Sequence, residues 1–479
     1  MQKTKLVEVI QGLDDKEIKR FEDYVNSPFF NKNDKVIDLL KFLRKYHPDF
    51  DNSRFTKENA YKAVFGARQK FNVQKLRNIM SQLFKLLEAY LVQLELDTDK
   101  DFYNISLLTA LDKRFIDKQF TQKYQEFKKQ KLSPLERTSK YYYTKYRIEG
   151  IAFNHSIKRN NRLIDTSMDE ADINLDYFFL TLKLRYYCVM LNSRNVITVK
   201  PNMEFANQIL DYLERSSLLE DSFFEQIPSI HFYYRLLLLL KEEEDSYYID
   251  LKELLASHRD ALPVKEIRQI YTAVFNYLNK KLKGGEGKYI RDIYELYKLM
   301  FEQDILIENG FINNHLNFRN ALIAGLRLGE LEWAEMFIEK YSPLLVPLNR
   351  ENWVNYSLAE LEFYKKHYKE TLKYLLGFEF QDAFNYADHK TLLAKTYYEL
   401  EEDEALFALT HAFRIYLHRD TNIAEHFQKP YHNFIRLLNK LAKARFDPNA
   451  NVQDIRQELQ ELKYISNREW LLKKMDELE

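Results

Sequence analysis

Four of the chain's 11 histidines lie close together near the C-terminus, and they are the residues best suited to bind a metal. They are His411, His418, His426 and His432. Zinc sites need ligands spaced to converge on one ion, as in His-Glu-x-x-His or paired-cysteine patterns, and neither pattern accompanies these histidines. Carboxylate pairs such as Asp97 and Asp99 lie at expected helix ends, where helix capping accounts for them. We therefore expect no metal, no cofactor and no enzymatic activity.

The single cysteine, Cys188, and the glycine cluster at 284–287 offer two further kinds of chemistry. Cys188 is flanked by tyrosine, valine and methionine, a setting typical of an inert core thiol rather than a nucleophile. The pair Gly287-Lys288 superficially matches the end of a phosphate-binding loop. That loop needs a glycine five residues before Gly287, where this chain has Leu282, and Ser or Thr after the lysine, where it has a tyrosine. We interpret the cluster as a turn between helices.

Positive charge is concentrated near the N-terminus, although the chain as a whole has 72 basic and 72 acidic residues. Between residues 54 and 85, Glu58 is the one acid among eight lysines and arginines. A local excess of this kind can neutralise nucleic-acid phosphates or an acidic partner, and the solvated face of a long helix shows the same excess. The residues best placed for nucleic-acid contact are Lys70, Lys75, Arg77 and Lys85.

The elements that position these residues are expected to be helices. Glycine and proline number 10 each among 479 residues, so turns are few and the elements between them are long. Near the N-terminus the hydrophobic pattern predicts helices over 14–26, 34–47 and 72–97. Asp14 and Thr56 have the residue types that cap helix N-termini. A chain of this length exceeds one ordinary globular core, which indicates several domains or one extended array.

A recurring pattern distinguishes the C-terminal third of the chain. Small residues occur at matching points of three expected helix hairpins, at Ala334, Thr371 and Ala405, which are 37 and 34 residues apart. A period in this range is typical of stacked helix hairpins. The physical reason is that two antiparallel helices approach closely only where their side chains are small.

Residues 313–418 resemble tetratricopeptide repeats. The resemblance rests on Leu328-Gly329 with Ala334, Leu358-Ala359 with Thr371, and Leu393-Ala394 with Ala405. Glu362 departs from that family, because it occupies a position where the family usually has an aromatic residue. The resemblance implies a right-handed α-solenoid in which the first helix of each hairpin faces a concave groove.

Position by position, the resemblance places eight side chains on this groove. They are Arg319, Asn320, Trp353, Tyr356, Glu360, Tyr364, Lys395 and Tyr398. Aromatic and arginine side chains are frequent anchors at interfaces, so we expect a contact strip for a protein or peptide. Its centre would be Trp353, Tyr356, Glu360 and Tyr364. The alternative is that Trp353 and Tyr356 pack against neighbouring hairpins.

The N-terminal part more weakly resembles a winged-helix DNA-binding domain. The resemblance rests on Thr56-Lys57-Glu58-Asn59-Ala60-Tyr61 followed by a basic helix that begins near Asn72. Such domains precede tetratricopeptide repeats in some bacterial regulators. The long helix expected over 72–97 stands where that family has a short recognition helix and a β-hairpin wing.

Together these patterns predict an all-α fold, a right-handed α-solenoid of tetratricopeptide-like helix hairpins with an N-terminal helical module. The parts are the module at 1–97, a body of degenerate hairpins at 98–312, and the repeats with C-terminal capping helices at 313–479. One cysteine permits no disulfide within the chain, and no apolar segment approaches the roughly 20 residues of a membrane span. We therefore expect a cytoplasmic protein without membrane contact, and the resemblance to tetratricopeptide-repeat proteins implies that it is bacterial.

The function that these features predict is a non-enzymatic scaffold or adaptor that binds a protein or peptide on the concave face of the repeats. The alternative is a transcriptional or nucleic-acid-associated regulator, whose basic N-terminal module contacts DNA and whose repeats sense a peptide. The identity of the partner and the oligomeric state stay open.

Overall fold

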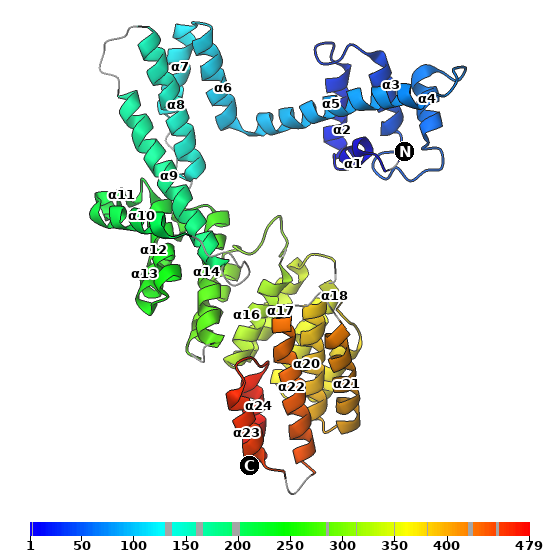
Figure 1. The fold of residues 1–479 in the computed structure, drawn as a ribbon, viewed down its shortest axis with the longest axis vertical. Coiled ribbons are helices and arrows are strands. Elements are labelled where there is room, and N and C mark those ends of the chain that lie inside the picture. Colours follow the sequence, from blue (N-terminus) through cyan, green and yellow to red (C-terminus); the bar gives the residue numbers. More distant parts are fainter. Residues whose placement is uncertain are drawn as a thin grey trace. The chain divides into compact units, whose positions relative to one another are not determined.

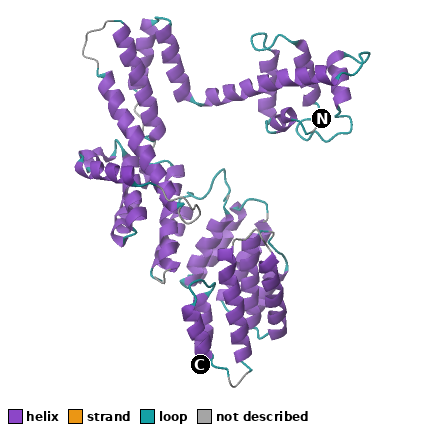
Figure 2. Cartoon of the chain, viewed as in Figure 1, coloured by secondary structure: helices purple, strands orange, loops and turns teal. Residues whose placement is uncertain are grey.

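The structure is a computed structural model, and it describes the chain except residues 2, 130–136, 160–165, 194–201, 284–286, 313, 349, 381, 420–424 and 447–449 (Figure 1). The described residues form 24 α-helices and no β-strand, which confirms the expected all-α fold (Figure 2). The glycine-rich turn expected at 284–287 lies outside the described residues apart from its last glycine. No described helix is long and apolar enough to cross a membrane.

The described residues divide into two compact units. Unit 1 comprises residues 1–183 with 225–230, and unit 2 comprises residues 184–224 with 231–479. The boundaries expected at 97/98 and 312/313 each fall inside one unit, so the division into three parts stays a prediction.

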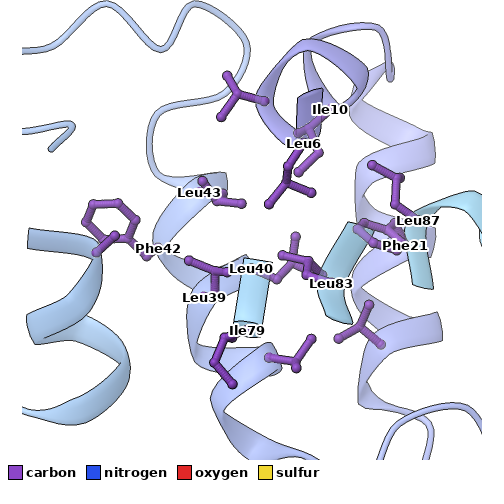
Figure 3. Close-up of a cluster of buried hydrophobic side chains, with 14 of the residues drawn as sticks. Leu6, Ile10, Phe21, Leu39, Leu40, Phe42, Leu43, Ile79, Leu83 and Leu87 are labelled. Carbon is purple, nitrogen blue, oxygen red and sulfur yellow. The ribbon is translucent and has the colours of Figure 1, made fainter. Parts of the chain in front are cut away.

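The first part of unit 1 is a five-helix module with its own core. Its helices are α1 (Lys5–Gln11), α2 (Asp15–Asn26), α3 (Asp34–Arg44), α4 (Lys57–Phe65) and α5 (Val73–Thr98). Leucine, isoleucine and phenylalanine side chains from α1, α2, α3 and α5 meet in this core, and Figure 3 shows Leu6, Phe21, Leu40 and Leu83 among them. The expected caps are present: Asp14 accepts hydrogen bonds from the backbone of Lys16 and Glu17, at 2.7 and 2.8 Å.

The second part of unit 1 is a helical bundle. Its helices are α6 (Lys100–Lys113), α7 (Asp117–Lys128), α8 (Ser139–Lys158) and α9 (Ser167–Asn192) as far as Lys183. Ile105, Leu108, Phe120 and Ile148 form the core between α6, α7 and α8. The rest of α9, from Leu184 on, belongs to unit 2.

Unit 2 begins with helices that pack around long aromatic and aliphatic side chains. They are α10 (Glu204–Arg215), α11 (Asp221–Phe224), α12 (Pro228–Glu242), α13 (Asp245–His258), α14 (Val264–Lys283) and α15 (Tyr289–Glu302). Cys188, on α9, is buried here, and burial raises the pKa of its thiol, which agrees with an inert core residue.

His231, on α12, gives this part of unit 2 a predictable pH dependence. Its side chain is buried against Phe224, and burial lowers its pKa to about 4. Because the unfolded chain takes up a proton near pH 6.5 and the folded chain only near pH 4, stability falls as pH drops through this window. We expect His231→Phe, which cannot titrate, to gain about 2–3 kcal/mol relative to wild type between pH 8 and pH 4.5.

Hydrogen exchange of the α12 amides at the two pH values measures this gain. A difference between wild type and variant that stays constant with pH would contradict the assignment. His411→Phe, at an exposed histidine, is the matched control and should leave the pH dependence unchanged.

The rest of unit 2 is an array of antiparallel helix pairs, which we call the hairpin array (residues 314–479). Its helices are α16 (His315–Arg327), α17 (Leu331–Tyr341), α18 (Arg350–Tyr364), α19 (Tyr368–Leu376), α20 (Ala383–Glu399), α21 (Asp403–Arg419), α22 (Glu425–Ala444), α23 (Val452–Glu461) and α24 (Arg468–Asp476). Consecutive helices contact each other, and α16, α18, α20 and α22 also contact in sequence, so alternate helices form one layer.

The turns inside the first three hairpins share one backbone geometry. Gly329, Lys366 and Glu401 follow α16, α18 and α20 with φ angles of 80°, 65° and 60°. In each turn the next residue donates its N–H back across the helix end, as from Glu330 to the carbonyl of Gly325 at 3.0 Å. This is the Schellman arrangement, which favours glycine at the left-handed position. The recurrence shows that the three hairpins are built alike, even where their sequences differ.

The turn geometry predicts opposite effects for two exchanges. We expect Lys366→Gly to raise the free energy of unfolding by about 0.5–1 kcal/mol, because Lys366 is exposed and strained in a left-handed conformation. Gly329→Ala should lower it by a similar amount. Thermal unfolding of both variants checks this, with Lys373→Gly in the exposed interior of α19 as a control that should be destabilised. A destabilised Lys366→Gly protein would contradict the expectation.

The small residues expected inside the hairpins are placed correctly in two cases and wrongly in the third. Ala334 and Thr371 are the fourth residues of α17 and α19 and are fully buried. The fourth residue of α21 is Leu406, which is also fully buried, whereas Ala405 is half-buried. The matching positions are therefore 37 and 35 residues apart, and the third is not small.

A close helix approach that the sequence analysis missed occurs at Gly325 in α16. A Cβ atom there would lie 2.6 Å from Cζ3 of Trp333 and 3.3 Å from Tyr294. We expect Gly325→Ala to destabilise unit 2 by about 1–3 kcal/mol despite the higher helix propensity of alanine, because the indole must move. Thermal unfolding measures the loss, and Trp333→Leu combined with Gly325→Ala should recover part of it. A Gly325→Ala protein as stable as wild type would contradict this close packing.

Candidate functional site

The expected groove residues lie on helices of one layer, α16, α18 and α20, which contact one another in that order. The structure therefore places them on neighbouring helices. We call the face of this layer that carries Arg319, Tyr356, Glu360 and Lys395 the inner face.

Trp353 and Tyr356, the expected centre of the contact strip, are buried. Their exposed fractions are 5% and 2%. The Trp353 ring lies 4.8 Å from that of Phe380 and stacks on His315 at 5.3 Å, and Tyr356 meets Phe380 edge-on at 5.6 Å. This burial favours the alternative that both rings pack between hairpins, rather than forming an open strip for a partner.

Charged side chains accompany these rings on the inner face. The guanidinium of Arg319 pairs with Asp388 at 2.7 Å and lies over the Tyr356 ring, 5.4 Å from its centre. Tyr356 donates a hydrogen bond to Glu360 at 2.9 Å, and Tyr431 of α22 donates one to Asp388 at 2.8 Å. We call these five residues the inner-face network. They join four helices, α16, α18, α20 and α22.

One hydrogen-bond donor of the inner-face network has no acceptor within the described residues. The Nε donor of Arg319 is buried and has no hydrogen-bond partner among the described residues, and neither has the hydroxyl of Ser357 nearby in sequence. Burial alone would lower the pKa of Arg319, but Asp388, Tyr356 and Glu360 outweigh it and raise the pKa. Arg319 therefore stays charged, with one buried donor unused.

Lys395 lies on the inner face as well, in α20 near its C-terminal end. It is 6% exposed, and its ammonium lies over the rings of Phe363 and Trp470, at 4.4 and 5.8 Å. It donates a hydrogen bond to Asn467 at 3.2 Å. Burial lowers the pKa of Lys395, and the carboxylates of Glu360 and Glu399 act against this shift.

The other three expected groove residues differ in exposure. Tyr398 is buried under the guanidinium of Arg445, which lies 3.6 Å from its ring centre. Tyr364 is half-buried, and burial together with Glu360 raises its pKa. Asn320 is exposed and hydrogen bonds to Tyr297, whose pKa burial raises to about 12.

Sequence reasoning missed Asp388, Tyr431 and the contacts of α24 on this face. Asp388 lies within the expected first helix of the third hairpin, but nothing in its neighbours marks it as the partner of Arg319. The pairing spans 69 residues and becomes visible only once α16 and α20 lie in one layer.

The basic residues of the N-terminal module form a second candidate surface. Lys70, Lys75, Arg77 and Lys85 are all exposed, around the start of α5 and along it. Within the described part of the chain, none of the four makes an ion pair or a side-chain hydrogen bond. The exposed ring of Phe71 lies among them, edge-on to Tyr61. The described residues therefore supply no acidic partner for these four positive charges.

The clustered histidines do not assemble into a metal site in the described residues. No group of three or more histidine, cysteine, aspartate or glutamate side chains is placed there to hold an ion. The side chain of His426 lies outside the description, and burial lowers the pKa of His432.

Comparison with known proteins adds no family assignment. No protein-family model, curated protein or solved structure matches the chain.

Proposed function

We propose that the protein is a non-enzymatic scaffold that binds a protein or peptide segment on the inner face of the hairpin array. The observation that carries this proposal is the inner-face network with its unused Arg319 donor. Packing alone does not require buried charges, because an apolar set of similar volume is often equally stable. The Arg319 side chain as a whole is 19% exposed, so a polar segment of a partner would reach it from the solvent side of the inner face.

The recurrent hairpins support the same proposal at the level of architecture. Three hairpins with matching turns, and first helices in contact, are what a tetratricopeptide-like right-handed solenoid would contain. Such arrays present long inner faces to extended or helical segments of other proteins.

Affinity capture with Arg319→Lys tests the proposal. Lysine keeps the positive charge beside Asp388 but removes the Nε donor and the planar fork of the guanidinium. We expect a protein captured by the wild-type chain to be captured at least tenfold less by the variant, with unchanged circular dichroism. Arg291→Lys, at a half-exposed arginine of α15 paired with Glu330, is the matched control. Equal capture by wild type and Arg319→Lys would show that Arg319 does not contribute to binding, and would contradict the proposal.

A second candidate function rests on the basic surface of the N-terminal module, and we propose that it contacts the phosphates of nucleic acid. The four exposed, unpaired cations at Lys70–Lys85 support it, since each phosphate contact releases counterions. We expect the full chain to bind duplex DNA with affinity that falls steeply as salt rises.

Replacing Lys70, Lys75 and Arg77 by glutamine should reduce the slope of log affinity against log salt by about 3. Glutamine at Lys366, Lys369 and Lys373 removes the same charge from exposed positions of the hairpin array and serves as the control. No DNA binding even at low salt, or equal losses in both triple variants, would reject the candidate. Capture of an acidic protein by the same surface would reject it in favour of a protein partner.

A further inference from the structure

The last helix, α24, lies on the inner face of the hairpin array. Its residue Glu469 accepts two hydrogen bonds from Arg327 near the end of α16, at 2.6 and 2.7 Å. Trp470 meets Tyr398 of α20 edge-on at 5.3 Å, and Asn467, just before the helix, accepts from Lys395. The helix also contacts α22, beside which Figure 1 draws it in red. It therefore reaches two first helices, α16 and α20, at their C-terminal ends.

Glu399, the last residue of α20, is the main polar anchor for α24. One carboxylate oxygen accepts the indole N–H of Trp470 at 2.9 Å, and the other accepts from the ammonium of Lys474 at 2.8 Å. The side chains of Lys474 and Glu399 are only 8% and 9% exposed. Trp470 and Lys474 are four residues apart, so they project from one face of the helix. Glu399 thus recognises a tryptophan and a lysine one helical turn apart.

The apolar side of α24 completes the docking. Leu471 and Met475 are fully buried and belong to the same core as Phe434 and Leu438 of α22. The opposite side, with Glu469, Lys473 and Asp476, is exposed. A short amphipathic helix is therefore seated on a surface that offers it apolar contact, one carboxylate and one arginine.

The docking of α24 has the features of a replaceable contact. A helix of nine residues is marginal on its own, so its order depends on the surface beneath it. Its polar anchor is a buried ion pair, which contributes little net stability because desolvation offsets the attraction. Asn467 at its start has a left-handed backbone, with φ of 54°, a conformation that is strained for a residue other than glycine.

We propose that α24 is the internal occupant of a helix-binding site, and that the external partner is an amphipathic helix carrying tryptophan and lysine four residues apart. This inference rests on the proposed function and names the chemistry of its partner. Glu399 binds the tryptophan and the lysine of the partner helix. Arg327 binds an acidic residue directly before the tryptophan. In the free protein the tethered α24 competes at an effective concentration in the millimolar range. A partner must therefore bind more tightly than α24 does, or follow its release.

The probe is a fluorescein-labelled peptide with the sequence of residues 463–479, added to the full-length protein. In the wild-type chain, hydrogen exchange of the amides at 468–476 should speed up when the peptide is present, because the peptide takes the place of α24. A peptide with alanine at both Trp470 and Lys474 is the matched control and should leave exchange unchanged. Unchanged exchange with the intact peptide at saturating concentration would overturn the proposal.

A full-length variant provides the second measurement. Trp470→Ala with Lys474→Ala weakens the internal helix, so the variant should bind the labelled peptide at least tenfold more tightly than wild type. Adding Glu399→Gln should remove this gain. Lys473→Ala, on the exposed side of α24, should bind the peptide like wild type. Equal peptide affinities in the double variant and wild type would contradict internal occupancy, and the exchange experiment decides alone if the variant does not fold.

Failure of this inference is distinguishable from failure of the proposed function. A captured partner that depends on Arg319 but binds wild type and the Trp470/Lys474 variant equally would overturn the role of α24 and leave the scaffold proposal standing. Peptide exchange at the Glu399 site, with no partner that depends on Arg319, would support the helix-binding site and overturn the inner-face network as the binding element.

Discussion

Replacing Trp353 with alanine should destabilise the hairpin array by about 3–5 kcal/mol. The indole is 5% exposed and contacts His315 of α16 and Phe380, which lies between α19 and α20. Its removal leaves a cavity where three hairpins meet, and the surrounding helices cannot close it without losing their own contacts. We expect a lower thermal midpoint of unit 2 and faster hydrogen exchange in α18 and α20.

The control for this prediction separates volume from position. Trp353→Phe keeps an aromatic ring against Phe380 and should cost much less than the alanine substitution. Leu376→Ala, at a leucine of α19 that is 62% exposed, should change stability by no more than about 0.5 kcal/mol. A Trp353→Ala protein as stable as wild type would show that the ring is a surface group, and would restore the original expectation of a contact strip.

The sequence predicted the helices, but it could not decide whether Trp353 lies in an open groove or packs between hairpins. Helical periodicity and the scarcity of glycine and proline depend on neighbouring residues, so the all-α fold, the cap at Asp14 and the long helix α5 were predictable. Whether a helix face is open or covered depends on elements far along the chain. The segment that covers Trp353 includes Phe380, 27 residues away, and no local pattern marks it.

The register of the third hairpin illustrates a second limit. Ala405 was expected at the close approach because alanine is small, but the buried fourth position of α21 is held by Leu406. A close approach without room for a side chain lies instead at Gly325, opposite the indole of Trp333. Small residues permit close packing without requiring it, so residue size alone places a contact only to within a residue or two.

The position at which α24 docks could not be inferred from the sequence, for a related reason. Its pattern of Trp470, Leu471, Lys474 and Met475 predicts an amphipathic helix, which a terminal cap or a free segment would share. The link from Arg327 to Glu469 spans 142 residues. Pairings at that separation are specified by the whole array, and they decide whether a groove is empty or already occupied.

The second large effect on stability is expected in the inner-face network. Comparing stability and binding across its variants distinguishes a role in recognition from a role in holding the helices together. Arg319→Met should destabilise unit 2 by about 2–4 kcal/mol, because it leaves Asp388 partly buried with Tyr431 as its one remaining partner in the network. The side chains of Arg319 and Asp388 are 19% and 25% exposed, so solvent screening places the loss below that of a fully buried pair.

Arg319→Met combined with Asp388→Leu and Tyr431→Phe replaces the Arg319–Asp388 ion pair and the Tyr431 hydroxyl with apolar groups, while Glu360 keeps its hydrogen bond from Tyr356. We expect this triple variant to recover to within about 1 kcal/mol of wild type, since no buried charge is left without a partner. It should nevertheless fail to capture any protein that the wild-type chain captures through Arg319. Stability restored and binding lost would show that the charges serve recognition. A triple variant as unstable as Arg319→Met would instead show that they hold the hairpins together, because only a structural role ties stability to the charges themselves.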